Sequence, residues 1–431
     1  MIKIEPMSSG GRTAPATALT PRLTEPHVLA IGLAASGVFV VAAAVTAIVR
    51  VAQGSGVWAG LHLALAGAAT VAIGTFMPHF AVTLAGTRPA AATERLTSLA
   101  LLAAGALLAV LGITILGGEW AAAGSAVMVS GLGIVAWHTF RPSRDPLARR
   151  HTVVALAYGL ALLQFATGIV LGGLGALGAD AIVAEWGVLR AAHAWITLFG
   201  AVSVTIFATL VYLAPTVLGA RIRAGAALFV GVAGMLLGPV IVSLGFVLHA
   251  MPITAAGMIL TLVGAVGQVG YVLDAYRRRG PFTTEHDWRR VSIGHLLAGP
   301  TWFLAAVAAA TAELLMGRPL LGWSIGVLAV PMVAGWMLQE LVGSWTHLVP
   351  SVTVGDAASH ARQRRVLAVA SRSRLVAWNA GVGLAWLGIV IGGPLAVIGL
   401  VLVGSALVSS LVLLARALFM APDDGGRLWS R

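Results

Sequence analysis

Apolar residues fill long stretches of this chain, and short segments with charged residues or prolines separate the stretches. Stretches of 18 or more residues recur between Val28 and Met420, and each is long enough to cross a bilayer as a helix. Twelve spans result, with approximate limits 28–50, 57–84, 97–117, 120–140, 151–174, 189–218, 224–250, 252–275, 290–315, 319–349, 375–393 and 395–420. The pattern predicts an all-α polytopic membrane protein with about twelve transmembrane helices.

The twelve spans form one predicted transmembrane domain, residues 28–420. Residues 1–27 lack the apolar core and the small-residue cleavage site of a signal peptide, so we expect a disordered N-terminal tail. Residues 421–431 are expected to be a short C-terminal tail. Between the spans, no linker is long enough to separate soluble domains, and no internal repeat is evident.

The positions of Lys and Arg predict how the spans are oriented. With the N-terminus in the cytoplasm, all but three of the 27 Lys and Arg residues fall on the cytoplasmic side, the exceptions being Arg50, Arg190 and Arg318. Cytoplasmic loops of membrane proteins carry such an excess of positive charge. We therefore expect a multi-pass protein of the cytoplasmic membrane with both termini in the cytoplasm.

Composition limits the chemistry that the chain can perform. The chain is 59% hydrophobic and 10% charged, far from the roughly 25% charged residues of soluble domains. It has no cysteine, which excludes disulfides, thiolate metal sites, iron–sulfur clusters and covalent haem attachment through cysteines. Metal chemistry would therefore rest on the 11 histidines. The net charge of +12 reflects the cytoplasmic arginines, so the lipid bilayer, not nucleic acid, is the expected partner.

Three histidines are predicted at a similar depth on the outer side of the membrane. His62 lies near the outer end of the second span, His193 near the start of the sixth, and His249 at the end of the seventh. Ionisable residues inside a membrane need partners and are candidates for function. Neutral imidazole is also a good ligand for haem iron or copper. The alternative is a structural hydrogen bond to a neighbouring helix.

A second group of ionisable residues is predicted nearer the cytoplasm. It contains His79, His295, Glu340 and His347. Glu340 and His347 lie seven residues apart on one span, so they share a side of that helix. We consider these residues a candidate proton path; the alternative is a hydrogen-bond network that only packs the helices.

The sequence around His193 carries a family resemblance. RAAHAWITLFGAVSVTIFATLVYLAPTVLG, residues 190–219, resembles the sixth-helix region of large subunits in the haem–copper oxidase superfamily, which includes respiratory oxidases and nitric-oxide reductases. It looks closest to a divergent group of haem–copper-oxidase-like membrane proteins. The resemblance implies a twelve-helix haem–copper-oxidase-like bundle that binds haem b, copper or both. It implies that His62 is a haem ligand, that His193 and His249 are copper ligands, and that a cytochrome or cupredoxin exchanges electrons with the protein.

The chain departs from that family at three places. Ala250 follows His249 where the oxidases have a second histidine, and Thr197 stands four residues after His193 where they have a tyrosine. The tenth span has no histidine in its outer half. We therefore expect no complete binuclear oxygen-reducing centre.

Three functions remain open at this point. The first is a haem- or copper-binding redox protein, an oxidoreductase in its enzymatic form. The second is a proton-coupled transporter, in which the histidines and Glu340 mark a protonatable path. The third is a non-catalytic assembly or sensory membrane protein. Phosphate-loop, Ser-His-Asp and HExxH patterns are missing from the sequence, so hydrolysis has no support.

Overall fold

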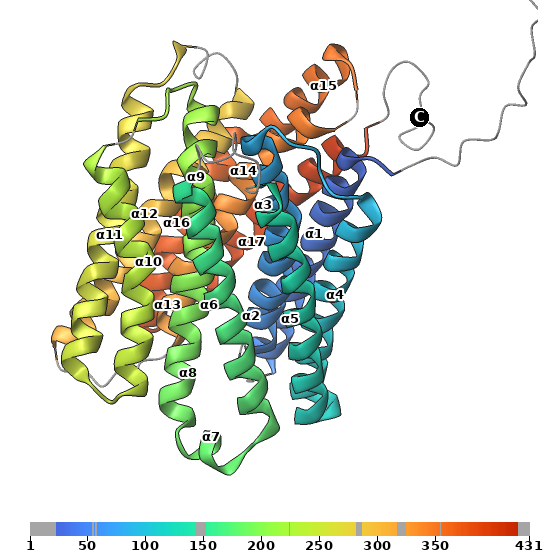
Figure 1. Cartoon of the computed structure of the whole chain (residues 1–431). Helices are drawn as coiled ribbons and strands as arrows, with labels where there is room; N and C mark the ends of the chain where they lie inside the picture. The colour runs from blue at the N-terminus through green and yellow to red at the C-terminus, as the bar shows by residue number, and fades with distance from the viewer. Residues whose placement is uncertain are drawn as a thin grey trace, which may run out of the picture.

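The structure is a computed structural model that consists of helices joined by short connections (Figure 1). It describes residues 23–53, 56, 58–142, 152–223, 225–281, 287–316, 325–353 and 355–420. Within those ranges, 12 helices are long and apolar enough to cross a membrane. The prediction of an all-α polytopic membrane protein is confirmed. The terminal tails lie mostly outside the described residues, although the first helix already begins at Glu25.

The spans follow one another in chain order, and three of them contain a π-helical segment between two α-helices. The first four are α1 (Glu25–Ala52), α2–η1–α3 (Trp58–His62, Leu63–Ala69, Thr70–Ala85), α4–η2 (Ala92–Leu111, Gly112–Leu116) and α5 (Gly118–Phe140). The next four are α6 (Thr152–Leu177), α8–η5–α9 (Trp186–Ala194, Trp195–Val202, Ser203–Leu218), α10 (Ala226–Val247) and α11 (Met251–Arg277). The last four are α12 (Asp287–Leu315), α13–η7–α14 (Ile325–Ala329, Val330–Met337, Leu338–Val352), α16 (Ser371–Ile391) and α17 (Leu395–Leu418). Two short helices lie outside the spans, α7 (Asp180–Ala184) and α15 (Ala357–Ala368).

The second, sixth and tenth spans form the centre of the bundle. In their most apolar windows 67–78% of the residues are buried, against 33–50% in the other nine spans of the described chain. Each of these three spans contains one π-helical segment, η1, η5 or η7, which follows a short α-helix at the start of the span. Segments of this kind are rare and occur often at functional sites.

The central spans also repeat one another beyond the π-helical segments. Helices α3 and α9 both have 16 residues, and each ends at a glycine in the left-handed conformation, Gly86 with φ 64° and Gly219 with φ 61°. Pro215 in α9 and Pro350 in α14 occupy the same position, twelve residues after the start of each helix. The second, sixth and tenth spans of the described chain thus share backbone features that no similarity of sequence had indicated.

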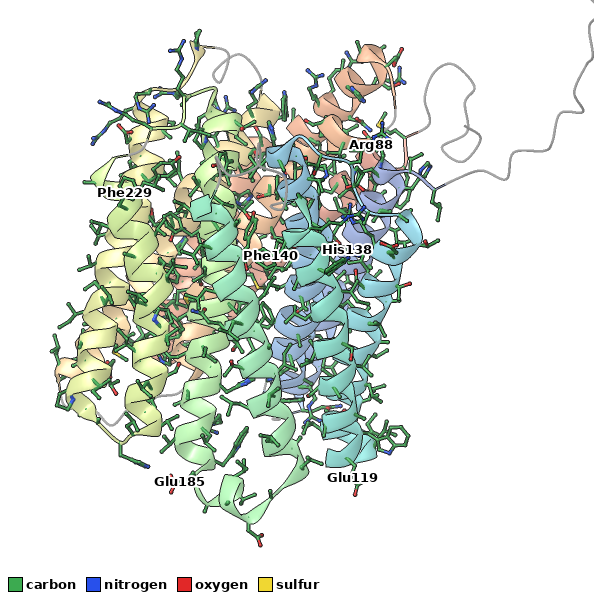
Figure 2. All side chains as sticks on the ribbon, in the orientation of Figure 1. Arg88, Glu119, His138, Phe140, Glu185 and Phe229 are labelled. Atoms are coloured by element: carbon green, nitrogen blue, oxygen red, sulfur yellow. The ribbon has the colours of Figure 1, made fainter. Side chains whose placement is uncertain are left out.

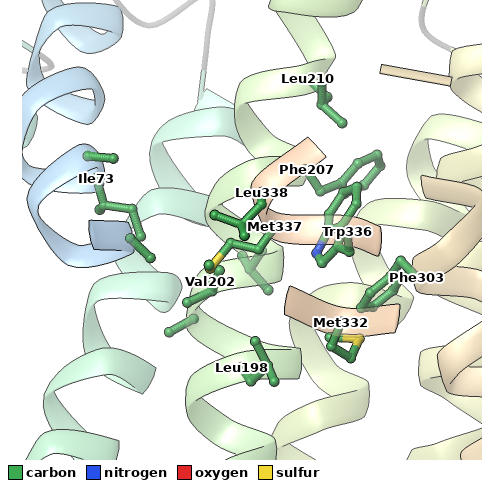
Figure 3. Packing of buried hydrophobic residues seen from close by; sticks show 14 of the residues in the cluster. Ile73, Leu198, Val202, Phe207, Leu210, Phe303, Met332, Trp336, Met337 and Leu338 are labelled. Atoms are coloured by element: carbon green, nitrogen blue, oxygen red, sulfur yellow. The ribbon is translucent and has the colours of Figure 1, made fainter. Parts of the chain in front are cut away.

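Glycines allow neighbouring spans to approach closely. A Cβ atom added to Gly234 of α10 would lie 2.5 Å from the Cα atom of Gly264 in α11. Only a residue without a side chain fits such a contact, and small residues are typical of helix interfaces in membranes. Larger side chains fill the centre of the bundle, where Phe207, Phe303 and Trp336 pack together (Figure 3).

The two ends of the bundle differ in charge. Arg88 and the arginine-rich helix α15 lie at one end, whereas Glu119 and Glu185 lie at the other (Figures 1 and 2). We call these the basic end and the opposite end. α7, which joins the fifth and sixth spans, also lies at the opposite end (Figure 1).

Candidate metal-binding site

His62 and His193 lie next to each other, although 131 positions separate them in the sequence. His62 is the last residue of α2, directly before η1, and His193 lies two residues before η5. Both side chains are half-buried. The two central spans thus bring one imidazole each to the same level, near the opposite end of the bundle.

The planes of the two imidazole rings are nearly parallel. Their planes differ by 6°, and their centres are 6.3 Å apart. Trp58, one turn before His62, stacks on the His62 ring with a distance of 4.0 Å between ring centres. An aromatic side chain therefore limits how the His62 ring can turn.

Backbone carbonyl groups fix the tautomer of both rings. Nδ1 of His62 donates to the carbonyl oxygen of Trp58 at 2.9 Å, and Nδ1 of His193 donates to that of Gly168 at 2.8 Å. A carbonyl oxygen can only accept, so both Nδ1 atoms carry the hydrogen. Neither Nε2 atom forms a hydrogen bond with any other described residue. Both rings therefore keep the Nε2 lone pair free, which is the arrangement of a metal-ligating histidine with its supporting acceptor.

The spacing of the rings fits one metal ion between them. Two imidazoles that bind an ion from opposite sides at about 2.0–2.1 Å have ring centres about 6 Å apart. The observed 6.3 Å agrees with this value. Among the described residues, no group of three or more His, Cys, Asp or Glu side chains is arranged to hold a metal. His62 and His193 would supply two imidazole ligands to haem iron or to a copper ion.

The structure does not bring His249 to this pair. α10 ends at Val247, and the chain then turns through His249, whose φ is +50°. The side chain is 63% exposed, and its Nε2 atom lies 3.2 Å from a carboxylate oxygen of Glu185. Ser243, six residues earlier, contacts the His193 region: its hydroxyl group donates to the carbonyl oxygen of Ala192 at 3.3 Å. His249 therefore lies beyond the pair, at the surface of the opposite end.

The four residues of the predicted proton path do not form one cluster in the described part of the structure. His79 lies 3.1 Å from the carboxylate of Glu25, which also pairs with the buried Arg95. His295 is fully buried, and its Nδ1 atom donates to Oε1 of Gln339 at 2.7 Å.

The other two residues of the predicted path lie on α14. Glu340 is buried, and neither of its carboxylate oxygens has a hydrogen-bond partner. His347 packs against the Trp288 ring, with 6.1 Å between ring centres. The described residues do not join these four positions by a continuous chain of hydrogen bonds.

A buried polar network surrounds His295, and the sequence reasoning missed most of it. Nε2 of Gln339 donates to Oδ1 of Asn379 at 3.1 Å, and Nε1 of Trp302 donates to the same oxygen at 2.9 Å. The network joins α12, α14 and α16. Gln339 and Asn379 are polar residues inside apolar stretches, and that was the available signal.

Comparison of the chain with models of known protein families and with curated proteins finds no match.

Proposed function

We propose that the protein is an integral membrane redox protein that binds haem, copper or both through His62 and His193. The observation that carries the proposal is the pair of parallel imidazoles, 6.3 Å between centres, each with Nδ1 held by a carbonyl group and Nε2 free. Neither Nε2 atom has a hydrogen-bond partner among the described residues while each Nδ1 is held by a carbonyl group, and this combination favours a ligand role.

The chain would orient and protect the cofactor, and the cofactor would carry the electron. The carbonyl groups of Trp58 and Gly168 hold the rings in the ligating tautomer, and the Trp58 ring shields one side of His62. We further propose kinship with respiratory oxidases and nitric-oxide reductases, on the resemblance around His193 and on the central position of the second, sixth and tenth spans. The departures at Ala250 and Thr197 argue against a complete oxygen-reducing centre.

The proposed orientation places the basic end in the cytoplasm. Positive residues favour the cytoplasmic side, and Arg88 and the arginines of α15 lie together at that end. The imidazole pair then lies toward the outer face of the cytoplasmic membrane. There Glu119, Asp180 and Glu185 are exposed, and these carboxylates would meet a basic electron-transfer partner, such as a cytochrome or a cupredoxin.

Absorption spectra of the purified protein, oxidised and dithionite-reduced, test the proposal together with metal analysis. We expect a Soret band, or copper in stoichiometric amount, and its loss in His62→Ala and His193→Ala. His360→Ala, which removes a histidine at the basic end, is the matched control and should keep the cofactor. A colourless, metal-free protein from cells replete in haem and copper would refute the proposal.

His249→Ala separates a two-ligand site from a three-ligand site. Because the His249 side chain is exposed and faces Glu185, we expect the cofactor content and the spectrum to remain unchanged. Loss of copper in this variant would show that His249 is a copper ligand. Retention of both cofactor content and cellular phenotype in the His62→Ala/His193→Ala double variant would favour the non-catalytic assembly or sensory role.

A proton-coupled transporter is the second candidate, and one observation favours it. Glu340 is buried among the central spans, and both of its oxygens lack a partner, whereas a structural carboxylate would be paired. Proton-driven uptake into liposomes that Glu340→Gln or His295→Ala abolishes would support this function. Equal uptake by the wild-type protein and both variants would exclude these residues from any such path.

A further inference from the structure

Five arginines gather at the basic end of the bundle, where α9 and α11 end. They belong to the segment between α9 and α10 and to the C-terminal end of α11. We call them the arginine cluster: Arg221, Arg223, Arg277, Arg278 and Arg279. Two hydrogen bonds hold the segments together. The backbone N–H group of Gly280 donates to the carbonyl oxygen of Leu218 at 2.9 Å, and Nη1 of Arg278 donates to that of Arg221 at 2.7 Å.

The positive charge of the arginine cluster exceeds the negative charge that the described chain supplies to it. Nε and Nη2 of Arg278 donate to Oδ2 of Asp274, at 3.1 and 2.6 Å. Arg223 and Arg277 interact with the same carboxylate electrostatically. The side chains of Arg221, Arg223 and Arg277 form no hydrogen bond with a described residue. Their guanidinium groups therefore keep their donors available to an anion from outside the chain.

The ends of the helices account for only part of the arginine cluster. Cations are stabilised at the C-terminus of a helix, where the helix dipole is negative. Arg279 is placed in this way, because its Nη1 donates to the carbonyl oxygen of Tyr276 at 3.1 Å and its guanidinium group lies 4.1 Å from the centre of the Tyr276 ring. Arg223 is not, because it stands three residues before Ala226, where α10 begins and the dipole is positive.

Exposed apolar side chains border the arginine cluster. Ile222 lies between two of its arginines, and Phe229 of α10 and Leu273 of α11 are also exposed. Phe229 lies at the same end of the bundle as the arginines (Figure 2). The two helices are in contact at this level, since a Cβ atom on Gly270 would lie 3.7 Å from that of Ala227. A phospholipid matches both parts of this surface, with a phosphate for the arginines and acyl chains for the apolar side chains.

We propose that the arginine cluster is a binding site for an acidic phospholipid, whose phosphate contacts Arg221, Arg223 and Arg277 and whose acyl chains lie over Phe229 and Leu273. Guanidinium groups bind phosphate oxygens through paired, charge-assisted hydrogen bonds. Basic sites between transmembrane helices are typical places for acidic headgroups. The proposal does not depend on the redox function, because lipid binding and cofactor content are measured separately.

Native mass spectrometry of the delipidated protein in detergent tests the proposal. The probe is dioleoylphosphatidylglycerol. Dioleoylphosphatidylcholine, which has the same acyl chains and no net charge, is the control lipid. We expect one phosphatidylglycerol molecule to bind per chain with an affinity at least about tenfold above that of phosphatidylcholine. Equal affinity for the two lipids would overturn the proposal.

Two double variants locate the site. Arg221→Gln/Arg223→Gln removes two charges from the arginine cluster and should weaken phosphatidylglycerol binding at least about tenfold. Arg365→Gln/Arg372→Gln removes the same charge from exposed arginines on α15 and α16, and should change the affinity less than about twofold. Circular dichroism and size-exclusion chromatography establish that both variants are folded. Equal affinity of the two variants would mean that the basic end attracts acidic lipid as a whole, and the proposed site would be refuted.

Competition distinguishes a lipid from a free phosphate compound. Glycerophosphoglycerol is the headgroup of phosphatidylglycerol without its acyl chains, and inorganic phosphate carries the anion alone. Because the proposed site also contacts the acyl chains, both should displace the lipid only at concentrations at least about a hundredfold higher than that of the lipid. Displacement by either compound at an equal concentration would mean that the arginines bind phosphate without regard to the lipid, which would contradict the proposal.

Discussion

Thr70 and Ser203 make the same hydrogen bond in two different spans. Each hydroxyl group donates to the carbonyl oxygen five residues earlier, that of Leu65 at 3.0 Å and that of Leu198 at 2.7 Å. The π-helical segments η1 and η5 end directly before these two residues, so the bonds satisfy carbonyl groups where the wider helix returns to α-helical geometry. Ser203 also takes part in a second hydrogen bond, in which its oxygen accepts from Nε1 of the fully buried Trp336 at 3.0 Å.

Ser203→Ala should therefore destabilise the protein more than Thr70→Ala. Loss of Ser203 leaves the Trp336 N–H group buried without an acceptor, at a cost of about 1–3 kcal/mol, whereas Thr70→Ala removes one helix-internal bond worth about 0.5–1.5 kcal/mol. Thermal unfolding in detergent, followed by intrinsic fluorescence, compares the two. An equal fall in melting temperature would mean that the hydrogen bond between Ser203 and Trp336 does not contribute to the stability of the protein.

Ala370 adopts a left-handed conformation, with φ 52° and ψ 32°, at the start of α16. This conformation costs residues with a Cβ atom about 1–2 kcal/mol, while glycine adopts it freely. Ala370→Gly should raise the stability by about 1 kcal/mol. Ala380→Gly, at an exposed position in the middle of α16, is the matched control and should lower it by a similar amount. A lower melting temperature for both variants would show that Ala370 is not strained.

Glu25 and Arg95 form an ion pair that ties α1 to α4, and Arg95 also donates to the carbonyl oxygen of Thr75 at 2.6 Å. Glu25→Gln leaves the buried Arg95 without its counter-charge, and Arg95→Met leaves Glu25 with His79 alone. Each change should cost up to about 3–5 kcal/mol, while the double variant should lose less than the sum. A double-mutant cycle on thermal stability measures this coupling; strictly additive losses would mean that the pair is not coupled.

Much of the fold was predictable from the sequence, because length and hydropathy alone determine which segments cross a membrane. The third span shows the limit: it was predicted to begin at 97 and begins at Ala92. Arg95 falls outside the predicted span 97–117, yet it lies in the helix and is buried against Glu25. A charged residue inside a span is placed by its partner, and Glu25 is 70 residues away in the sequence.

The candidate site was predictable in part. Topology gave His62 and His193 a common depth, but depth does not determine which sides of two helices face each other. The same reasoning grouped His249 with them, because it could not foresee that α10 would end at Val247 and turn the next residues toward Glu185. The π-helical segments shared by the three central spans were not predictable from the sequence, since such segments depend on packing and have no simple residue pattern.

Asp356 makes the start of α15 sensitive to acid. Its carboxylate accepts a hydrogen bond from the backbone N–H group of Ser359 at 2.8 Å, and hydrogen bonds from Ser359 hold the pKa of Asp356 below its usual value. Since the folded-state pKa is depressed, the cap stabilises α15 at neutral pH, and this contribution disappears as the pH falls through that pKa. Hydrogen exchange of residues 357–361, corrected for intrinsic rates, should show protection falling below about pH 4. In Asp356→Asn, whose amide caps without titrating, protection should not vary with pH.

The contact between Gly168 and Thr197 tests whether the position of α6 controls the imidazole pair. A Cβ atom on Gly168 would collide with Cγ2 of Thr197, and the carbonyl group of Gly168 is the one that holds Nδ1 of His193. Gly168→Ala should therefore push α6 away from η5 and weaken that hydrogen bond. We expect lower thermal stability, by about 1–3 kcal/mol for an overpacked contact, together with reduced cofactor content or a shifted spectrum.

Thr197→Ser provides the matched compensation. It removes Cγ2 but keeps the hydroxyl group that donates to the carbonyl oxygen of His193 at 2.6 Å. Alone it should change little, because the hydrogen bond remains and only one methyl group is lost. Combined with Gly168→Ala, it removes the collision, since the next atoms near the added Cβ lie at 3.4 and 3.5 Å, ordinary contact distances. The double variant should recover both stability and spectrum. Recovery of stability without recovery of the spectrum would show that the Gly168 carbonyl group does not control the proposed ligand, His193.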